Sequence, residues 1–167
     1  MPARQLWLIR HAKSDWVHGV PDFQRDLNDR GRNDGPFMAE WLRSQPKPAQ
    51  WIWSSTAKRA LATARFVAAG FALEEGHIIA VDALYHAPPE SALDVLRGTP
   101  PDITSVAMVF HNPGITDLVN LLAGQQVLDN LPTFGIAQFS TTEAWAYAHP
   151  PAFTLDRIVT PRGLRTI

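Results

Sequence analysis

Short apolar runs alternate with amphipathic segments along the first two thirds of the chain. Residues 6–9 (LWLI), 50–53, 77–81 and 106–110 are apolar runs of the length of a strand. Between them, apolar residues recur at helical spacing within residues 37–42, 61–68, 91–96 and 115–122. Strands that alternate with helices are typical of a parallel sheet. The pattern therefore predicts a three-layer α/β fold, a doubly wound and mostly parallel sheet with helices on both faces.

The last third of the chain has a different pattern. Residues 136–141, 144–147 and 155–160 are predicted to be strands joined by short links, so we expect an antiparallel strand at one edge of the sheet. No repeat, low-complexity segment or linker interrupts the chain. Its length suits one domain with a substantial core, so residues 1–167 are predicted to form a single domain.

Two helix starts and one long connection have recognisable signals. Thr56 is predicted to cap the helix that contains residues 61–68, because a threonine hydroxyl accepts a hydrogen bond from a free backbone N–H there. Pro113 suits the first position of the helix that contains residues 115–122. The first strand and first helix are separated by about twenty residues rich in Asp, Asn, Arg and Gly, and connections of that length are usually functional or mobile.

Composition excludes several classes of protein. Lys and Arg number 15 and Asp and Glu number 16, so the basic excess of a typical nucleic-acid-binding protein is missing. Cysteine is absent, which excludes disulfides, thiolate nucleophiles and cysteine metal sites. No apolar run has the length of a signal peptide or a membrane span. We therefore expect a soluble, cytoplasmic protein without nucleic-acid or membrane partners.

Unusual polar residues follow three of the predicted strands. Arg10 and His11 come directly after the first strand, Arg59 lies early in the helix after the second, and His111 follows residues 106–110. In an open parallel sheet, residues just beyond the carboxyl ends of the strands converge on one crevice. The topology therefore predicts two arginines and two histidines around one pocket.

This combination of side chains suits phosphate chemistry. Guanidinium groups match phosphate oxygens, and positive neighbours hold an imidazole neutral, which makes it a competent nucleophile toward phosphorus. One alternative is that each residue has a separate structural role, although four such residues at strand ends favour a common site. The other alternative is a histidine metal site, but the six histidines lack HxH or HExxH spacing and the arginines would repel a cation.

Three motifs resemble the histidine phosphatase superfamily, which also contains the cofactor-dependent phosphoglycerate mutases. They are LIRHAKS, SSTAKRALATA and FHNPGIT, in the order and at spacing compatible with the family, and DFQRDLNDRGR resembles the segment before the family's first helix. The resemblance runs from Leu6 to about Gly135. The small size, the RHAKS wording and DNLPTFGIA are most similar to the SixA-type phosphohistidine phosphatase branch.

The resemblance implies a phosphoglycerate mutase-like fold and a role for each motif residue. His11 would be the nucleophile that forms a phosphohistidine intermediate, and Arg10, Arg59 and His111 would hold the phosphoryl oxygens. Ser14, Asp15 and Trp16 follow the first motif and are candidates for contacts to the substrate, with Trp16 at the entrance of the pocket. No metal and no other cofactor is implied.

One departure from the family concerns the general acid. Relatives often place an acidic residue in the loop after the third strand, where this chain has LYHAPPES. His86 occupies the most similar position and Glu90 is the nearest acid, although His86 could be a plain loop residue and Glu90 a helix first-turn residue. An imidazole leaving group is a far weaker base than an alkoxide and depends less on such an acid. The departure therefore favours phosphohistidine as substrate.

The sequence thus predicts a metal-independent phosphatase that acts through a phosphohistidine enzyme intermediate. Its substrate would be phosphohistidine in a partner protein or a small phosphorylated metabolite, and its oligomeric state stays open. The alternatives are a small-molecule phosphomonoesterase of the same superfamily and a non-catalytic module that binds a phosphorylated ligand. A mutase is disfavoured, because few further basic residues surround the three motifs.

Overall fold

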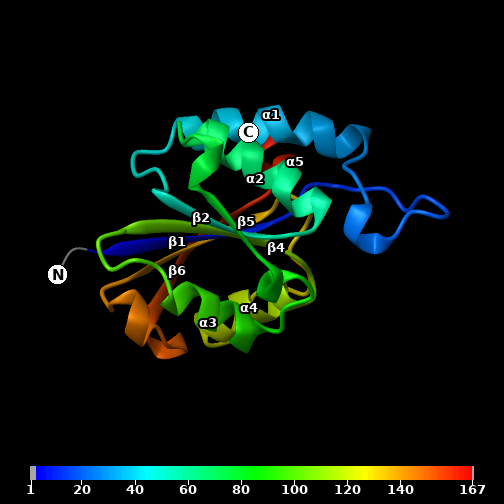
Figure 1. Cartoon of the computed structure of the whole chain (residues 1–167). Coiled ribbons are helices and arrows are strands. Elements are labelled where there is room, and N and C mark those ends of the chain that lie inside the picture. The colour runs from blue at the N-terminus through cyan, green and yellow to red at the C-terminus, as the bar shows by residue number, and fades with distance from the viewer. Residues whose placement is uncertain (1–2, 167) are drawn as a thin grey trace.

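Six strands form one mixed sheet at the centre of the protein (Figure 1). The structure, a computed structural model, describes residues 3–166. The strand order is β3-β2-β4-β1-β5-β6. The strands are β1 (Arg4–Arg10), β2 (Trp51–Ser55), β3 (Ile78–Val81), β4 (Ser105–Phe110), β5 (Ile136–Thr141) and β6 (Phe153–Val159). β1 to β4 are mutually parallel, and β5 is antiparallel to both of its neighbours, which confirms the predicted α/β sheet with antiparallel pairing at one edge.

Helices cover both faces of this sheet. α1 (Asp29–Arg43), α2 (Lys58–Gly70) and the short α5 (Pro161–Arg165) lie on one face, and α3 (Pro89–Arg97) and α4 (Gly114–Ala123) lie on the other (Figure 1). The predicted three-layer arrangement is therefore confirmed. Among residues 3–166, no helix combines the length and the apolar character that crossing a membrane requires.

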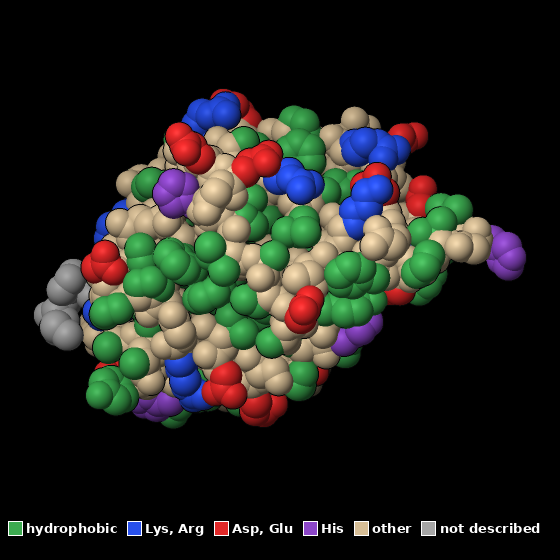
Figure 2. All heavy atoms as spheres, viewed as in Figure 1, with side chains coloured by type: hydrophobic (Ala, Val, Ile, Leu, Met, Phe, Trp, Pro, Cys, Tyr) green, Lys and Arg blue, Asp and Glu red, His purple; other side chains and the backbone are tan. Residues whose placement is uncertain are grey.

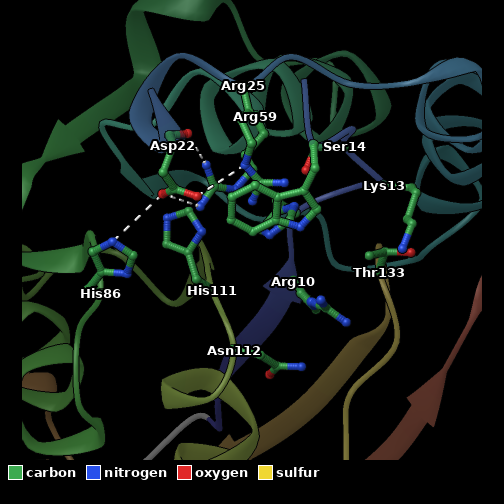
Figure 3. Close-up of a pocket in the computed structure, with 12 residues that line it drawn as sticks. Arg10, Lys13, Ser14, Asp22, Arg25, Arg59, His86, His111, Asn112 and Thr133 are labelled. Atoms are coloured by element: carbon green, nitrogen blue, oxygen red, sulfur yellow. Dashed lines mark hydrogen bonds and ion pairs between the residues drawn. The ribbon is translucent and has the colours of Figure 1, made fainter. Parts of the chain in front are cut away.

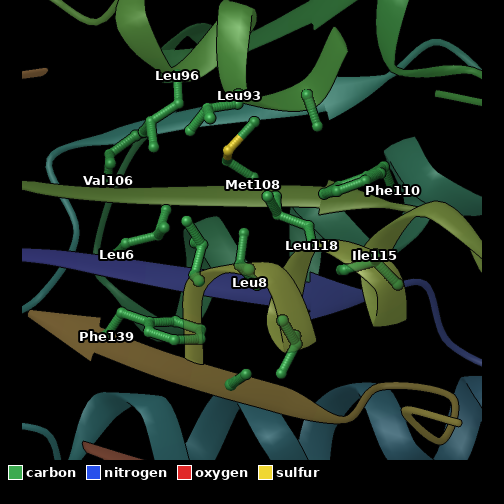
Figure 4. Packing of buried hydrophobic residues seen from close by; sticks show 14 of the residues in the cluster. Leu6, Leu8, Leu93, Leu96, Val106, Met108, Phe110, Ile115, Leu118 and Phe139 are labelled. Atoms are coloured by element: carbon green, nitrogen blue, oxygen red, sulfur yellow. The ribbon is translucent and has the colours of Figure 1, made fainter. Parts of the chain in front are cut away.

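The alternation of side chains along β1 explains why both faces need helices. Leu6 and Leu8 pack on the side of α3 and α4, whereas Trp7 and Ile9 pack on the side of α1 and α2. All four side chains are buried. Figure 4 shows the first of these two clusters, in which Met108 of β4 and Leu118 of α4 meet the leucines of β1.

One predicted strand is wrong. Residues 144–147 were expected to be extended, but Trp145–Tyr147 forms a 3-10 turn, η4. The alternating pattern there has a different origin, because the buried indole of Trp145 donates its Nε1–H to the carbonyl of Ile103 (2.7 Å). Further 3-10 turns are η1 (Asp22–Gln24), η2 (Glu75–His77), η3 (Asp82–Leu84) and η5 (Pro150–Ala152).

Both predicted helix starts are displaced. Ala57, not Thr56, is the N-cap of α2, and the hydroxyl of Thr56 instead donates a hydrogen bond to Asp82 (2.8 Å). Pro113 is the N-cap of α4 rather than its first helical residue. In each case the helix starts one residue away from the expected position, a difference that is common at helix ends.

The connection between β1 and α1, residues 11–28, crosses the carboxyl end of the sheet. It contains η1, and an antiparallel bridge joins Ser14 to Leu27 near its base. Asn28 ends the connection as the N-cap of α1, and its side chain accepts a hydrogen bond from the N–H of Gly31. The long polar connection is therefore an ordered part of the fold that lies over the strand ends.

The start of α4 packs so closely against the loop before α3 that only glycine fits at position 114. A Cβ atom there would lie 1.8 Å from the carbonyl oxygen of Ala87. We expect Gly114→Ala to lower the free energy of unfolding by about 1–3 kcal/mol, as overpacking usually does. Urea unfolding followed by circular dichroism measures this change. Gly76→Ala is the control, because nothing lies within 4 Å of its added Cβ. An unchanged midpoint for Gly114→Ala would contradict the expected clash.

Candidate active site

The sheet brings the four predicted pocket residues together. β4 lies between β1 and β2, so the segments that follow these three strands are neighbours at one edge. Arg10, His11, Arg59 and His111 all line one cavity of about 340 Å³ at that edge. The cavity is also lined by Lys13, Ser14, Trp16, Asp22, Arg25, His86, Asn112 and Thr133. Figure 3 shows Asp22 and Arg59 on one side of this pocket and Lys13 and Thr133 on the other.

His11 is held in one tautomer by the backbone beside it. Its Nδ1 lies 2.8 Å from the carbonyl oxygen of Ala12, which can only accept, so Nδ1 carries the proton and Nε2 keeps its lone pair. The N–H of Ala12 in turn donates to the hydroxyl of Thr63 (2.8 Å), which donates to the carbonyl of Arg59. The first two turns of α2 therefore fix the backbone that orients the histidine.

The imidazole of His11 is neutral at physiological pH. Burial lowers its pKa, and the positive charges of Arg59 and Arg10 lower it further, to about 3. The sequence predicted this direction from the neighbouring cations. The structure shows that loss of water around the buried ring is the larger cause.

His111 lies beside His11, with the two ring centroids 5.1 Å apart. Its Nε2 is 2.7 Å from the hydroxyl oxygen of Ser55, at the end of β2. Its Nδ1 is buried and has no hydrogen-bond partner in the part of the chain that the structure describes. Burial first, and then the nearby His11 and Arg59, lower the pKa of His111 to about 2. This side chain therefore lines the pocket and keeps one ring nitrogen without a hydrogen-bond partner among residues 3–166.

Each of the two predicted arginines donates a hydrogen bond from Nη1 to a backbone carbonyl and has an Nε atom without a partner among residues 3–166. Arg10 donates from Nη1 to the carbonyl of Leu131 (3.0 Å), and Arg59 donates from Nη1 to the carbonyl of Asp22 (2.7 Å). The Nε atoms of both arginines are buried, without a partner among residues 3–166. Burial and the charge of Arg59 lower the pKa of Arg10. Buried N–H groups without acceptors are costly, so both Nε–H groups suit an anion with several oxygen atoms.

Asp22 is one of the residues of this site that the sequence analysis did not predict. Its carboxylate accepts hydrogen bonds from Arg59 (3.1 Å), Arg25 (3.0 Å) and the hydroxyl of Tyr85 (2.5 Å). Burial alone would raise the pKa of Asp22, but the hydrogen bonds from Tyr85 and Arg59 and the charge of Arg59 together lower it to about 2. Asp22 is therefore ionised and offsets part of the positive charge in the pocket.

The signal for Asp22 and Arg25 was present in the chain. Both lie in DFQRDLNDRGR, the segment that resembles the family's approach to its first helix, and within the long polar connection. Nothing in that segment indicated which of its charged residues would face the pocket. Lys13, Asn112 and Thr133 were likewise not predicted to line it.

The three candidates after the first motif have different positions. Ser14 and Trp16 line the pocket, Trp16 with 80 % of its surface exposed. Asp15 lies outside the set of lining residues, and its carboxylate accepts a hydrogen bond from the side chain of Asn28 (3.1 Å). The structure thus places Asp15 at the base of the connection rather than at the pocket.

The two candidates for a general acid are also separated. His86 lines the pocket, with its Nε2 3.7 Å from a carboxylate oxygen of Asp22. Its backbone has a positive φ of 56°, a conformation that non-glycine residues rarely adopt outside functional or tight-turn positions. Glu90 is exposed in the first turn of α3 and does not line the pocket.

The charges in the pocket favour an anion over a cation. Lys13, Arg10, Arg25 and Arg59 line it together with the single carboxylate of Asp22. Residues 3–166 contain no group of three or more histidine, aspartate or glutamate side chains placed to hold a metal ion. The arrangement suits a phosphoryl group bound by arginine forks next to a neutral imidazole.

Comparisons with known proteins agree with this chemistry. The sequence model described as "Histidine phosphatase superfamily (branch 1)" matches residues 6–82. "Uncharacterized protein ML1117" of Mycobacterium leprae is 26 % identical over 166 residues, which cover 92 % of this chain and all of the relative.

Three of the solved structures with a similar fold illustrate the range of relatives. The putative phosphohistidine phosphatase SixA from Agrobacterium tumefaciens has a TM-score of 0.80 at 25 % identity, covering 95 % of this chain and 98 % of the other. The putative SixA from Nakamurella multipartitia has a TM-score of 0.82 at 24 % identity, covering 96 % and 98 %. The mycobacterial glucosyl-3-phosphoglycerate phosphatase Rv2419c has a TM-score of 0.70 at 17 % identity, covering 93 % and 98 %.

The lowered pKa of His11 predicts how stability depends on pH. Below pH 6.5 the unfolded chain takes up a proton on this imidazole, whereas the folded protein does so only near pH 3. The free energy of unfolding therefore decreases as the pH falls from 7 to 5. We expect His11→Gln to show a smaller decrease than the unmodified protein, measured by urea unfolding at both pH values. His18→Gln, at an exposed position of the same connection, is the control and keeps the full decrease. Equal pH dependence in His11→Gln and the unmodified protein would contradict this assignment.

Proposed function

We propose that this chain is a member of the histidine phosphatase superfamily, in its SixA-type branch. We propose further that it is a metal-independent phosphatase that hydrolyses phosphohistidine in a partner protein. The reaction passes through a phosphohistidine on the enzyme itself. No cofactor takes part, and we place the reaction in the cytoplasm. The imidazole of His11 carries the proposal, because it is neutral, held by Ala12 in the tautomer with a free Nε2, and surrounded by arginines.

In the first step, Nε2 of His11 attacks the phosphorus atom of the substrate. A new N–P bond forms while the bond from phosphorus to the imidazole of the substrate breaks, and that imidazole takes up a proton donated by His86 and leaves neutral. The Nε–H groups of Arg10 and Arg59 bind the phosphoryl oxygens and neutralise their charge. His111 donates from Nδ1 to a third oxygen when the hydroxyl of Ser55 donates to its Nε2.

In the second step, water attacks the phosphorus atom from the side that the leaving group has vacated. The bond to Nε2 of His11 breaks, inorganic phosphate forms, and the neutral imidazole is restored. Asp22 supports both steps indirectly, because its carboxylate holds the guanidinium groups of Arg59 and Arg25 in place. Asp22 is thus proposed as a positioning residue for these arginines.

The choice of phosphohistidine rests on the proton donors available. His86 is the titratable side chain on the rim that faces Asp22, whereas Glu90 lies outside the pocket. We assign proton donation to His86 and none to Glu90. A pocket without a carboxylic acid at this position suits a leaving group that needs little protonation, as imidazole does.

The alternative substrate is a small phosphorylated metabolite. Its support is the shared fold with glucosyl-3-phosphoglycerate phosphatase Rv2419c, a solved structure whose name describes a small-molecule phosphatase. A non-catalytic module that binds a phosphorylated ligand is the other rival. The three possibilities differ in whether a phosphoenzyme forms and in which leaving groups the enzyme accepts.

Replacement of His11 tests the nucleophile. We expect His11→Ala to abolish turnover of phosphohistidine and to form no phosphoenzyme, because the neighbouring neutral imidazole, His111, is assigned to hold a phosphoryl oxygen with its Nε2 tied to Ser55. The enzyme is mixed with ³²P-phosphohistidine in the presence of EDTA, which removes metal ions. The reaction is quenched in alkali, because acid hydrolyses the N–P bond of a phosphohistidine. His18→Ala is the matched control and should label as the unmodified protein does. The mechanism would be refuted by labelling of His11→Ala. It would also be refuted if EDTA abolished turnover by the unmodified protein and an added metal ion restored it.

Replacement of His86 tests the proton donor. We expect His86→Ala to lower kcat for an alkyl phosphate by about 10²-fold, the smaller end of general-acid effects, and to lower kcat for phosphohistidine by much less. Glu90→Ala should leave both values within a factor of about two, as surface substitutions usually do. Equal losses on both substrates in His86→Ala would assign His86 to binding instead of proton transfer.

A further inference from the structure

The tip of the connection between β1 and α1 is an exposed apolar projection. We call residues 16–20 (WVHGV) the finger. The exposed fractions of its large apolar side chains are 80 % for Trp16, 54 % for Val17 and 37 % for Val20. Figure 1 shows this connection extending beyond the rest of the molecule, and Figure 2 shows hydrophobic side chains gathered on the projection. Elsewhere in residues 3–166, only Leu121 and Tyr147 are large apolar or aromatic side chains with comparable exposure.

The finger is an ordered structure and not a loose loop. The N–H of Val20 donates to the carbonyl of Val17 (3.1 Å), which closes a four-residue turn. Gly19 has a φ of +82°, as the third residue of a type II turn requires. The guanidinium of Arg25 lies 3.9 Å from the ring centroid of Trp16 and holds the indole at the base of the turn. The fold therefore presents these apolar side chains to solvent in a defined arrangement.

The base of the finger is part of the active site. Trp16 and Arg25 line the same pocket as His11, and Arg25 donates from Nε to Asp22 (3.0 Å). Val17 and Val20 do not line the pocket and lie beyond its rim. A phosphate inside the pocket therefore reaches Trp16 at most, whereas a carrier that extends out of the pocket meets the valines as well.

We propose that the finger is a docking element for the polypeptide that carries the phosphohistidine, and that it selects apolar residues flanking the phosphorylated side chain. This inference rests on the proposed function. The pocket is strongly cationic, but the finger contains no acidic or permanently charged residue, so its preference is for apolar and not for charged neighbours. Burying apolar side chains of both partners supplies binding energy that a small phosphorylated metabolite would not obtain.

Three probes separate docking from chemistry. They are free phosphohistidine, a 13-residue peptide with a central phosphohistidine flanked by two leucines on each side, and the same peptide with serines in place of the leucines. We expect the leucine peptide to exceed the serine peptide in kcat/KM by about 10-fold, which corresponds to the burial of about one valine-sized side chain. The double variant Val17→Ser/Val20→Ser should lose this preference and hydrolyse free phosphohistidine at the unmodified rate.

Tyr147→Ser is the matched control. Its side chain is 73 % exposed in η4. This turn follows the end of β5 that pairs with the start of β1, so it lies at the opposite end of the strands from the pocket. This variant should keep the preference for the leucine peptide.

Each other outcome decides against the proposal. Equal kcat/KM for the two peptides, or a preference that survives in the double variant, overturns docking while turnover of free phosphohistidine upholds the proposed function. A dimer in sedimentation experiments that the double variant abolishes, without a peptide preference, assigns the finger to self-association. If no probe is hydrolysed, the proposed function fails and the docking inference fails with it.

Discussion

The parallel pairing of β4 with β1 on one side and β2 on the other is the constraint on which the active site depends. The register pairs Arg10 with Phe110, so the next residues of the two strands, His11 and His111, leave the sheet side by side. β2 ends at Ser55, whose hydroxyl contacts His111, and the chain continues into α2 with Arg59 in its first turn. A shift by one residue in the register of β1 or β4 would bring different residues to the ends of these strands and would separate His11 from His111.

The same site concentrates positive charge in a buried place, and the structure balances this with one carboxylate. Arg25 and Arg59 are almost completely buried, and unpaired buried charges would be costly. Asp22 accepts hydrogen bonds from both and approaches His86. It neutralises only part of the positive charge, so the pocket keeps an affinity for a phosphoryl group while the arginines stay fixed. The neutral state of His11 has two causes, burial of its ring first and the positive charge of the arginines second.

The long connection after β1 joins these features to the surface. Its ends are tied by the bridge between Ser14 and Leu27, its middle supplies Asp22 and Arg25 to the pocket, and its tip forms the finger. Arg25 connects the pocket with the finger, since it donates a hydrogen bond to Asp22 and its guanidinium lies against the indole of Trp16. Chemistry and the proposed recognition of the carrier are therefore built from one segment. Changes in this segment could alter substrate choice without altering the sheet that places His11 and His111.

Local patterns in the chain were sufficient for the sheet, the helices around it and the four motif residues of the pocket. A short apolar run between helical segments is typical of a strand that is buried on both faces. The carboxyl ends of parallel strands meet at one edge of a sheet, which is why Arg10, His11, Arg59 and His111 could be predicted to converge. The error at residues 144–147 arose because alternating apolar residues describe a strand and a buried turn equally well until the partner of Trp145, the carbonyl of Ile103, is known. Asp22, Tyr85 and the finger depended on tertiary structure, because hydrogen bonds between side chains 37 and 63 residues apart in sequence leave no local periodic signal.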